Sequence, residues 1–152
     1  MFTCFFIGHC DAPGSIQEQL NETVAYLVKE HHVTDFIVGH YGNFDRMATI
    51  AVQRAIRCFP ERELIAELLE PYFPGDRKLT VPLYFDGIYY PKGMENVPKR
   101  FCIEKANRKA LEQANWLVAY VCREGSNAAK LLRTARRWEK QGAITVINLG
   151  EL

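Results

Sequence analysis

Short apolar runs alternate with helically periodic segments along this chain, and that alternation limits its fold more than any other feature. The strand-like runs are residues 2–8, 35–39, 63–70, 116–121 and 143–149. The segments with apolar residues at every third or fourth position are residues 15–31, 44–59, 99–114 and 127–141. Strands that alternate with helices favour a parallel sheet joined by right-handed crossovers. The sequence therefore predicts an α/β fold.

The rhythm of the elements also suggests how the sheet is ordered. We expect a Rossmann-like three-layer sandwich whose mainly parallel, five-stranded sheet has the order 3-2-1-4-5. In that order the chain reverses direction across the sheet between the first and the fourth strand. Ligands of open α/β sheets bind at such a switch point, outside the carboxyl ends of the strands. The residues that follow each strand are therefore the first place to look for a site.

The helical segments differ in how clearly they are marked. Residues 44–59 have the widest apolar stripe, and Pro60 is expected to end that helix. At the start of residues 15–31, Ser15 fits an N-cap and Glu18 fits its capping-box partner.

Residues 71–98 break the rhythm and predict a long irregular loop. This segment contains Pro71, Pro74, Pro82, Pro91 and Pro98. Long irregular loops in compact domains are often functional lids. The aromatic residues of the loop would either stack on a base or pin the loop to the body; they are Tyr84, Phe85, Tyr89 and Tyr90. No linker or repeat divides the rest, so residues 1–152 are expected to form one domain.

Composition and cysteine spacing exclude several classes of protein. The formal net charge of +1 gives no electrostatic reason to expect nucleic acid or a membrane surface as a partner. No apolar run approaches the ~20 residues that cross a bilayer, and the apolar start is expected to be a buried strand rather than a signal peptide. The five cysteines are dispersed and form no CxxC pair. We therefore expect neither a disulfide framework nor a metal site, and we expect a reducing cytoplasm.

Three loops that contain glycine follow predicted strands and should meet at the switch-point edge. They are Gly8-His9-Cys10-Asp11, Gly39-His40-Tyr41-Gly42-Asn43 and Cys122-Arg123-Glu124-Gly125-Ser126-Asn127. Glycine lets backbone N–H groups approach a ligand, and a helix N-terminus favours negative charge. A phosphate group is thus the expected guest, although glycine also serves simply to make a tight turn.

Five segments together resemble the SLOG superfamily, which joins the DprA/Smf DNA-processing proteins and the LOG-type nucleotide hydrolases. They are FIGH, VGHYGNFDRMA, YYPKGMENVPKRFCIEKANRKAL, AYV with REGSNAAK, and VINL. The resemblance is to the small single-domain bacterial members and covers almost the whole chain. It implies a Rossmann-like fold that binds a nucleotide or nucleotide derivative. The residues that the resemblance implies for the site are Gly39, Gly42, Asn43 and Asp45 in one loop, Gly125, Ser126 and Asn127 in another, and Asn107 and Arg108 on a helix.

The chain departs from the family pattern at the loop of residues 122–127. Relatives generally carry a Gly-Gly pair where this chain has Gly125-Ser126 or Ser126-Asn127. LOG-type hydrolases also place a glutamate shortly after that loop, where this chain has Lys130, Leu131 and Leu132. Without that carboxylate, N-glycosidic hydrolysis cannot be carried over from the family, and no catalytic residue is assigned.

Several candidate residues have two interpretations that the sequence leaves open. Asp45 would cap its helix or accept a ribose hydroxyl, and Arg46 would pair with a phosphate or face solvent. His9 and His40 would serve as ligand donors or general bases, or as hydrogen-bonded structural residues.

Cys10 and Cys122 follow neighbouring predicted strands, so they are expected to lie near each other. They would form a redox pair, share a metal with His9 or provide a nucleophile. Alternatively, they are inert small apolar residues, which is the usual state of a free cysteine.

The sequence thus favours a cytoplasmic domain that binds a nucleotide or nucleotide derivative as a sensor, without a cofactor. The ligand-binding residues expected are Gly8, His9, Gly39, His40, Gly42, Asn43, Asp45, Arg46, Asn107, Arg108, Gly125, Ser126 and Asn127. One alternative is a LOG-like nucleotide-processing hydrolase. Another is a protein that binds single-stranded nucleic acid through a basic helix stripe, which comprises Lys130, Arg133, Arg137 and Lys140. A homodimer is expected by analogy with related folds.

Overall fold

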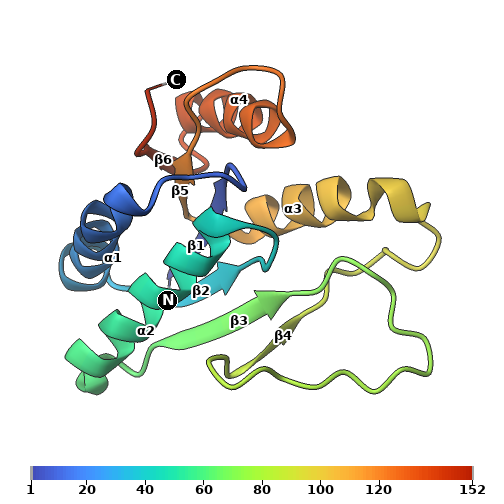
Figure 1. Cartoon of the computed structure of the whole chain (residues 1–152), viewed down its shortest axis with the longest axis horizontal. Coiled ribbons are helices and arrows are strands. Elements are labelled where there is room, and N and C mark those ends of the chain that lie inside the picture. The colour runs from blue at the N-terminus through green and yellow to red at the C-terminus, as the bar shows by residue number, and fades with distance from the viewer. Residues whose placement is uncertain (1, 152) are drawn as a thin grey trace.

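The computed structural model describes residues 2–151 and shows one open sheet with helices packed on both of its faces (Figure 1). Six strands form the sheet; they are β1 (Phe2–Gly8), β2 (Val33–Val38), β3 (Ile65–Leu69), β4 (Gly87–Tyr89), β5 (Trp116–Tyr120) and β6 (Thr145–Asn148). Four α-helices cover it; they are α1 (Gln17–His31), α2 (Asn43–Cys58), α3 (Cys102–Gln113) and α4 (Asn127–Lys140). Single 3-10 turns lie at Gly14–Ile16, Pro60–Arg62 and Lys99–Phe101.

The sheet has the order β4-β3-β2-β1-β5-β6, and all of its strand pairs are parallel. The α/β class and the parallel sheet are as predicted, but the prediction of five strands in the order 3-2-1-4-5 is wrong. It lacks the edge strand β4, which lies inside the segment predicted to be wholly irregular. The strand is three residues long and pairs with β3 from Glu67↔Gly87 to Leu69↔Tyr89. So short a run leaves no alternating pattern in a sequence rich in proline and glycine.

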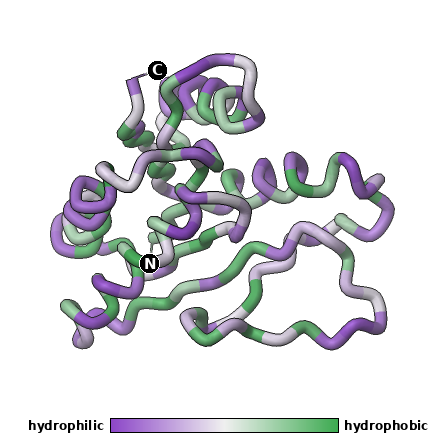
Figure 2. The backbone as a smooth tube through the Cα atoms, in the orientation of Figure 1, coloured by the Kyte–Doolittle hydropathy of each residue, from purple (hydrophilic) through white to green (hydrophobic). Residues whose placement is uncertain are grey.

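Each face of the sheet has its own core, because side chains alternate along the strands. On β1, Cys4 and Phe6 pack against α1 and α2, while Phe5 packs against α3 and α4. Burial of one such phenylalanine stabilises the fold by about 1.5–3 kcal/mol. Figure 2 shows the matching pattern of the helices, in which hydrophilic and hydrophobic stretches alternate from one turn to the next.

Helix α2 confirms the apolar stripe predicted for it. Its buried residues are Phe44, Met47, Ala48, Ala51, Val52 and Ala55. Helix α1 differs at its start: the N-cap is Ile16, without a side-chain capping bond, because a 3-10 turn takes up Gly14–Ile16 first. Ser15 is therefore not the N-cap of this helix.

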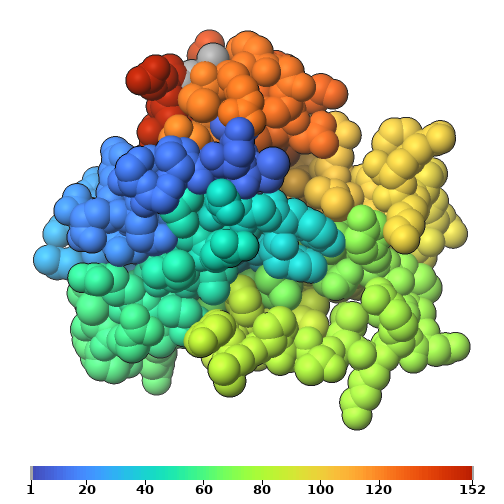
Figure 3. All heavy atoms as spheres, viewed as in Figure 1, coloured from blue at the N-terminus to red at the C-terminus, as the bar shows by residue number. Residues whose placement is uncertain are grey.

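The segment between β3 and α3 makes a wide excursion that includes β4. Figure 3 shows part of it, in light green, projecting from the body of the molecule. Several of its apolar side chains are exposed, among them Phe73, Leu83 and Tyr84. No helix in the described part of the chain is long and apolar enough to cross a membrane.

Candidate functional site

The carboxyl ends of β1, β2, β3 and β5 lie at one edge of the sheet, where the loops that follow them surround a cavity of about 300 Å³. We call it the switch-point cavity. The predicted site residues that line it are Gly8, His9, Gly39, Asp45, Asn107, Ser126 and Asn127. They come from three loops and from α3, so residues distant in sequence line the same cavity.

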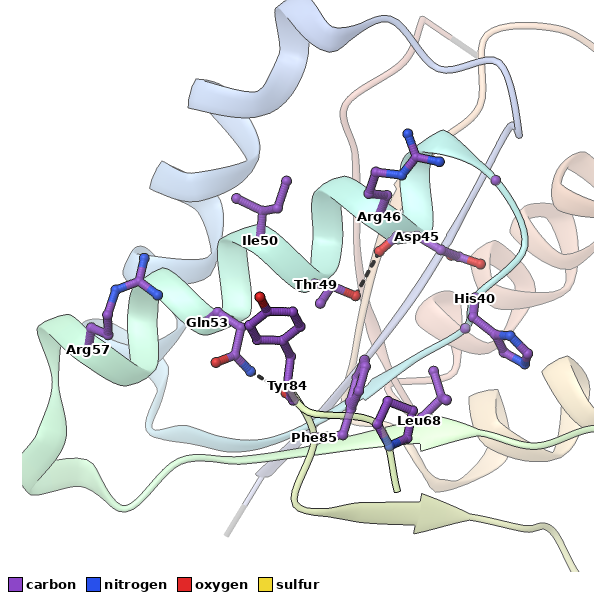
Figure 4. Close-up of a pocket in the computed structure, with 13 residues that line it drawn as sticks. His40, Asp45, Arg46, Thr49, Ile50, Gln53, Arg57, Leu68, Tyr84 and Phe85 are labelled. Carbon is purple, nitrogen blue, oxygen red and sulfur yellow. Dashed lines mark hydrogen bonds between the residues drawn. The ribbon is translucent and has the colours of Figure 1, made fainter. Parts of the chain in front are cut away.

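A second cavity of about 600 Å³ runs along the outer side of α2, between this helix and residues 82–85 (Figure 4). We call it the α2 groove. The predicted site residues that line it are Gly39, His40, Gly42, Asp45 and Arg46. Gly39 and Asp45 therefore belong to the walls of both cavities.

The loop of residues 82–85 is tied to α2 by one hydrogen bond. The Gln53 Nε2 atom donates to the backbone oxygen of Tyr84. Tyr84 is 59 % exposed, whereas Phe85 packs against the core of that face. Of the two roles weighed for these aromatic residues, pinning the loop thus describes Phe85, and the side chain of Tyr84 remains uncovered.

Three of the predicted glycines are required by the packing of the protein itself. Gly42 has φ +120°, and a Cβ atom there would lie 2.5 Å from the Cα atom of Cys10. A Cβ atom on Gly39 would lie 2.7 Å from Asp45 Oδ2, and one on Gly8 would meet the ring of Phe44 at 2.4 Å. These glycines bring the loops close together, which explains them without reference to a ligand.

The loop after β5 is different, because Gly125 has open space around it. Its φ of +85° favours glycine, but a Cβ atom added there would have no neighbouring atom within 4 Å. Gly125 lines neither cavity, whereas Ser126 and Asn127 line the switch-point cavity. Ser126 is also the N-cap of α4, and its Oγ atom accepts a hydrogen bond of 3.0 Å from the Ala129 N–H.

His9 is buried and joins the loops after β1 and β5. Its Nε2 atom accepts a hydrogen bond of 3.1 Å from the Cys122 N–H, so the ring proton lies on Nδ1. Burial lowers the pKa of His9, and the positive charge of Arg123 lowers it further. The neutral ring fits the structural interpretation of His9, because the lone pair on Nε2 already accepts the Cys122 hydrogen bond. His40, in contrast, is exposed beside the ring of Tyr41.

Asp45 lies at the wall between the two cavities. Its Oδ2 atom accepts a hydrogen bond of 2.9 Å from the Tyr41 N–H in the loop before α2, and its place in the first turn of α2 suits the helix dipole. Burial raises the pKa of Asp45 to about 6, and the Tyr41 hydrogen bond opposes this only in part. A carboxyl group that titrates near neutral pH at a cavity wall suits hydrogen bonding to a ligand hydroxyl as well as proton transfer.

Arg123 contributes a positive charge that sequence reasoning did not assign to the site. It lines the switch-point cavity and forms a 2.9 Å ion pair with Asp11. The hydrogen bond from Arg123 holds the pKa of the Asp11 carboxyl below its usual range. The pair spans from the β1 loop to the β5 loop. Its signal in the sequence was its place in the predicted loop, three residues after the end of β5.

The α2 groove also contains polar residues that sequence reasoning missed. Thr49, Gln53 and Arg57 line it together with Arg46 (Figure 4). The spacing of three or four residues places them on one side of the helix, opposite its apolar stripe. That periodicity was available in the sequence, but a polar helix face normally lies against solvent and attracts no functional interpretation.

Besides Gly125, two predicted residues lie away from both cavities. Asn43 is exposed, and its Nδ2 atom donates to the Ala12 oxygen at 3.4 Å. Arg108 forms a 3.9 Å ion pair with Glu112, and its guanidinium lies 5.7 Å from the centre of the Trp138 ring. Arg108 lines a separate groove between α3 and α4.

The two exposed cysteines of the edge loops, Cys10 and Cys122, are free thiols. Among residues 2–151, no group of three or more histidine, cysteine, aspartate and glutamate side chains is arranged to hold a metal ion. The hydrogen bond that His9 accepts from the Cys122 backbone also removes the ring nitrogen that a shared metal would need.

The basic stripe of α4 is partly neutralised within the chain. Arg133 pairs with Glu124, the residue that precedes Gly125. The Arg137 Nη2 atom is 3.4 Å from Thr134 Oγ1. The ion pair of Arg133 with Glu124 reduces the charge that the stripe offers to a phosphate backbone, whereas the hydrogen bond to Thr134 leaves Arg137 charged.

Comparison with models of known protein families found no match, and comparison with curated proteins found none. The function of this chain is therefore inferred from the chemistry of its own residues.

Proposed function

We propose that this protein binds a nucleotide or nucleotide derivative in the switch-point cavity and acts as a sensor or regulatory domain. The observation that carries the proposal is that predicted site residues from three separate loops and from α3 line one cavity. The cavity lies where open α/β sheets bind their ligands. Its volume of about 300 Å³ is at the lower end of the ~300–1,000 Å³ typical of small-molecule sites.

The residues around the cavity offer complementary groups for such a ligand. A phosphate group is expected beside Asn127 and Arg123, because the N-terminus of α4 and the guanidinium both favour negative charge. Asp45 is expected to accept a ribose hydroxyl from the opposite wall.

The proposal includes the family and setting that the sequence resemblance implies. We place the chain in the SLOG superfamily, as a bacterial, cytoplasmic member that forms a homodimer. The free thiols of all five cysteines, which lie in the described residues, support a reducing compartment.

One observation favours hydrolysis as a second candidate function. The carboxyl group of Asp45 has a pKa raised to about 6 and lines the same cavity, so it offers the proton-transfer group that the missing family glutamate would have supplied. Recovery of the bound nucleotide after incubation separates the candidates: a sensor returns it intact, and a hydrolase releases the free base.

A thermal-shift titration against nucleoside mono-, di- and triphosphates, NAD and ADP-ribose tests the proposal. A ligand at 100 times its dissociation constant stabilises the fold by about 2.7 kcal/mol. In Asn127→Asp, the new negative charge at the start of α4 is favourable to the helix by about 0.3–1 kcal/mol but repels a phosphate. We expect this variant to be at least as stable as the wild type and to bind roughly tenfold more weakly, a loss of about 1.4 kcal/mol.

Gln19→Glu is the matched control, since it adds the same charge in the first turn of α1, away from the cavity. It should leave nucleotide affinity unchanged. Equal weakening in both variants would show a general charge effect, and no shift with any nucleotide would contradict the proposal.

A further inference from the structure

The α2 groove contains two positive charges that the chain does not neutralise. Arg46 and Arg57 both line the groove, and neither forms a salt bridge with a carboxylate among residues 2–151. In the same part of the chain, Arg123 and Arg133 each pair with an acidic side chain. Arg57 lies eleven positions after Arg46 in α2, which corresponds to about 16 Å along the helix. The groove thus offers guanidinium donors near both of its ends.

The same groove is lined by an exposed aromatic side chain, Tyr84. The ring of Tyr84 lies beside Gln53 in the groove (Figure 4), and its backbone is held by the Gln53 hydrogen bond. This hydrogen bond holds the loop backbone at Tyr84, while the side chain is 59 % exposed and free for stacking. Stacking on aromatic side chains is a general way to bind a nucleobase, whichever base it is.

The groove and the switch-point cavity meet at a common wall. Gly39 and Asp45 line both, and Arg46 follows Asp45 directly on the groove side. At this wall Gly39 has no side chain, so the Asp45 carboxylate packs directly against its backbone. A Cβ atom on Gly39 would lie 2.7 Å from Asp45 Oδ2. A ligand that occupies the smaller cavity is therefore next to a larger one that has cationic and aromatic groups of its own.

We propose that the ligand is a dinucleotide, with one nucleotide in the switch-point cavity and its phosphate beside Asn127 and Arg123, the second phosphate beside Arg46, and the second base against Tyr84 in the α2 groove. This inference rests on the proposed nucleotide-binding function and specifies its ligand class. Asp45, between the two halves, accepts a hydroxyl of the ribose nearest the wall. Arg57 presents its donors to the acceptor atoms of the second base.

Calorimetric titrations with matched mono- and dinucleotides test the inference. The probes are AMP with diadenosine diphosphate, and GMP with diguanosine diphosphate. For one of the pairs, the dinucleotide should bind at least tenfold more tightly than the mononucleotide. Tyr84→Ala should weaken the dinucleotide about tenfold, which is within the range of base stacking on an aromatic residue, and should leave the mononucleotide within twofold. Arg57→Gln should act in the same direction.

Neighbouring residues provide the controls. Leu83 is 88 % exposed and Arg54 is exposed on α2, and neither lines the groove. Leu83→Ala and Arg54→Gln should therefore change neither affinity. If a mononucleotide binds but its dinucleotide is no tighter, or if Tyr84→Ala weakens both equally, the dinucleotide inference is overturned and the proposed function stands. If none of the four probes binds, the dinucleotide inference is overturned, and the thermal-shift titration against the wider nucleotide panel decides the proposed function.

Discussion

At the scale of single residues, the loops at the carboxyl edge combine packing requirements with functional chemistry. Gly8, Gly39 and Gly42 are glycines because Phe44, Asp45 and Cys10 approach them too closely for a side chain. Asp45 is the residue for which both interpretations keep support, since it lies in the first turn of α2, where a negative charge suits the helix dipole, and yet has a raised pKa at a cavity wall.

The raised pKa of Asp45 predicts how stability depends on pH. Its pKa of about 6 in the folded state exceeds the unfolded value of 3.8, so between these values the folded state binds more protons. The contribution of this group is thus full below about pH 4 and falls as pH rises through about 6. Asp45→Asn keeps an oxygen for the Tyr41 N–H and removes the titration. Relative to the wild type, it should gain on the order of 2 kcal/mol of unfolding free energy between pH 4 and pH 7.

Urea unfolding at a series of pH values measures this difference. Asp76→Asn, which replaces an exposed carboxylate in the excursion, serves as the control and should follow the wild-type profile. A parallel profile for Asp45→Asn would mean that the carboxylate is well solvated in the folded protein.

At the scale of elements, the helix starts show which local signals are used in the fold. Ser126 caps α4 with its Oγ atom, whereas Ser15 lies in the 3-10 turn before α1 and makes no capping bond. The two serines look alike in sequence, since each precedes a helical pattern. They differ because a 3-10 turn at Gly14–Ile16 precedes α1, whereas α4 begins directly after Ser126.

This difference can be measured by removing each hydroxyl. Ser126→Ala leaves the Ala129 N–H without its partner and should lower the unfolding free energy by about 1 kcal/mol. Ser15→Ala, at an exposed position, should change it by less than about 0.5 kcal/mol. Equal losses, seen in thermal or denaturant unfolding, would contradict the assigned caps.

At the scale of the whole molecule, the sheet interleaves the two halves of the chain. Strand β5 pairs with β1, and β4 pairs with β3, so strands that come later in the sequence flank the block of β1, β2 and β3 on both sides. The excursion itself has exposed side chains and few backbone hydrogen bonds; Arg77, for example, bonds only within a local turn to Pro74.

Limited proteolysis tests this arrangement. Trypsin should cut first after Arg77 or Lys78, because exposed backbone with little hydrogen bonding opens most readily. The two fragments should then elute together in gel filtration under native conditions, since each supplies strands to the common sheet. Initial cleavage after Arg54 or Arg57, within α2, or separation of the fragments would contradict the described packing.

The sequence by itself determined the α/β class, the parallel sheet and the buried face of α2, because these depend on local periodicity that survives in a single chain. It also located the strand-end loops from which the candidate site is built. Only the tertiary structure decided what local patterns do not record. It added β4, whose three residues become a strand through pairing with β3. It assigned Gly8, Gly39 and Gly42 to packing, joined His9 to the Cys122 backbone, and brought Tyr84, Arg46 and Arg57 together in the lining of the α2 groove. Each of these depends on contacts between residues far apart in sequence, whose spacing is fixed only when the loops meet.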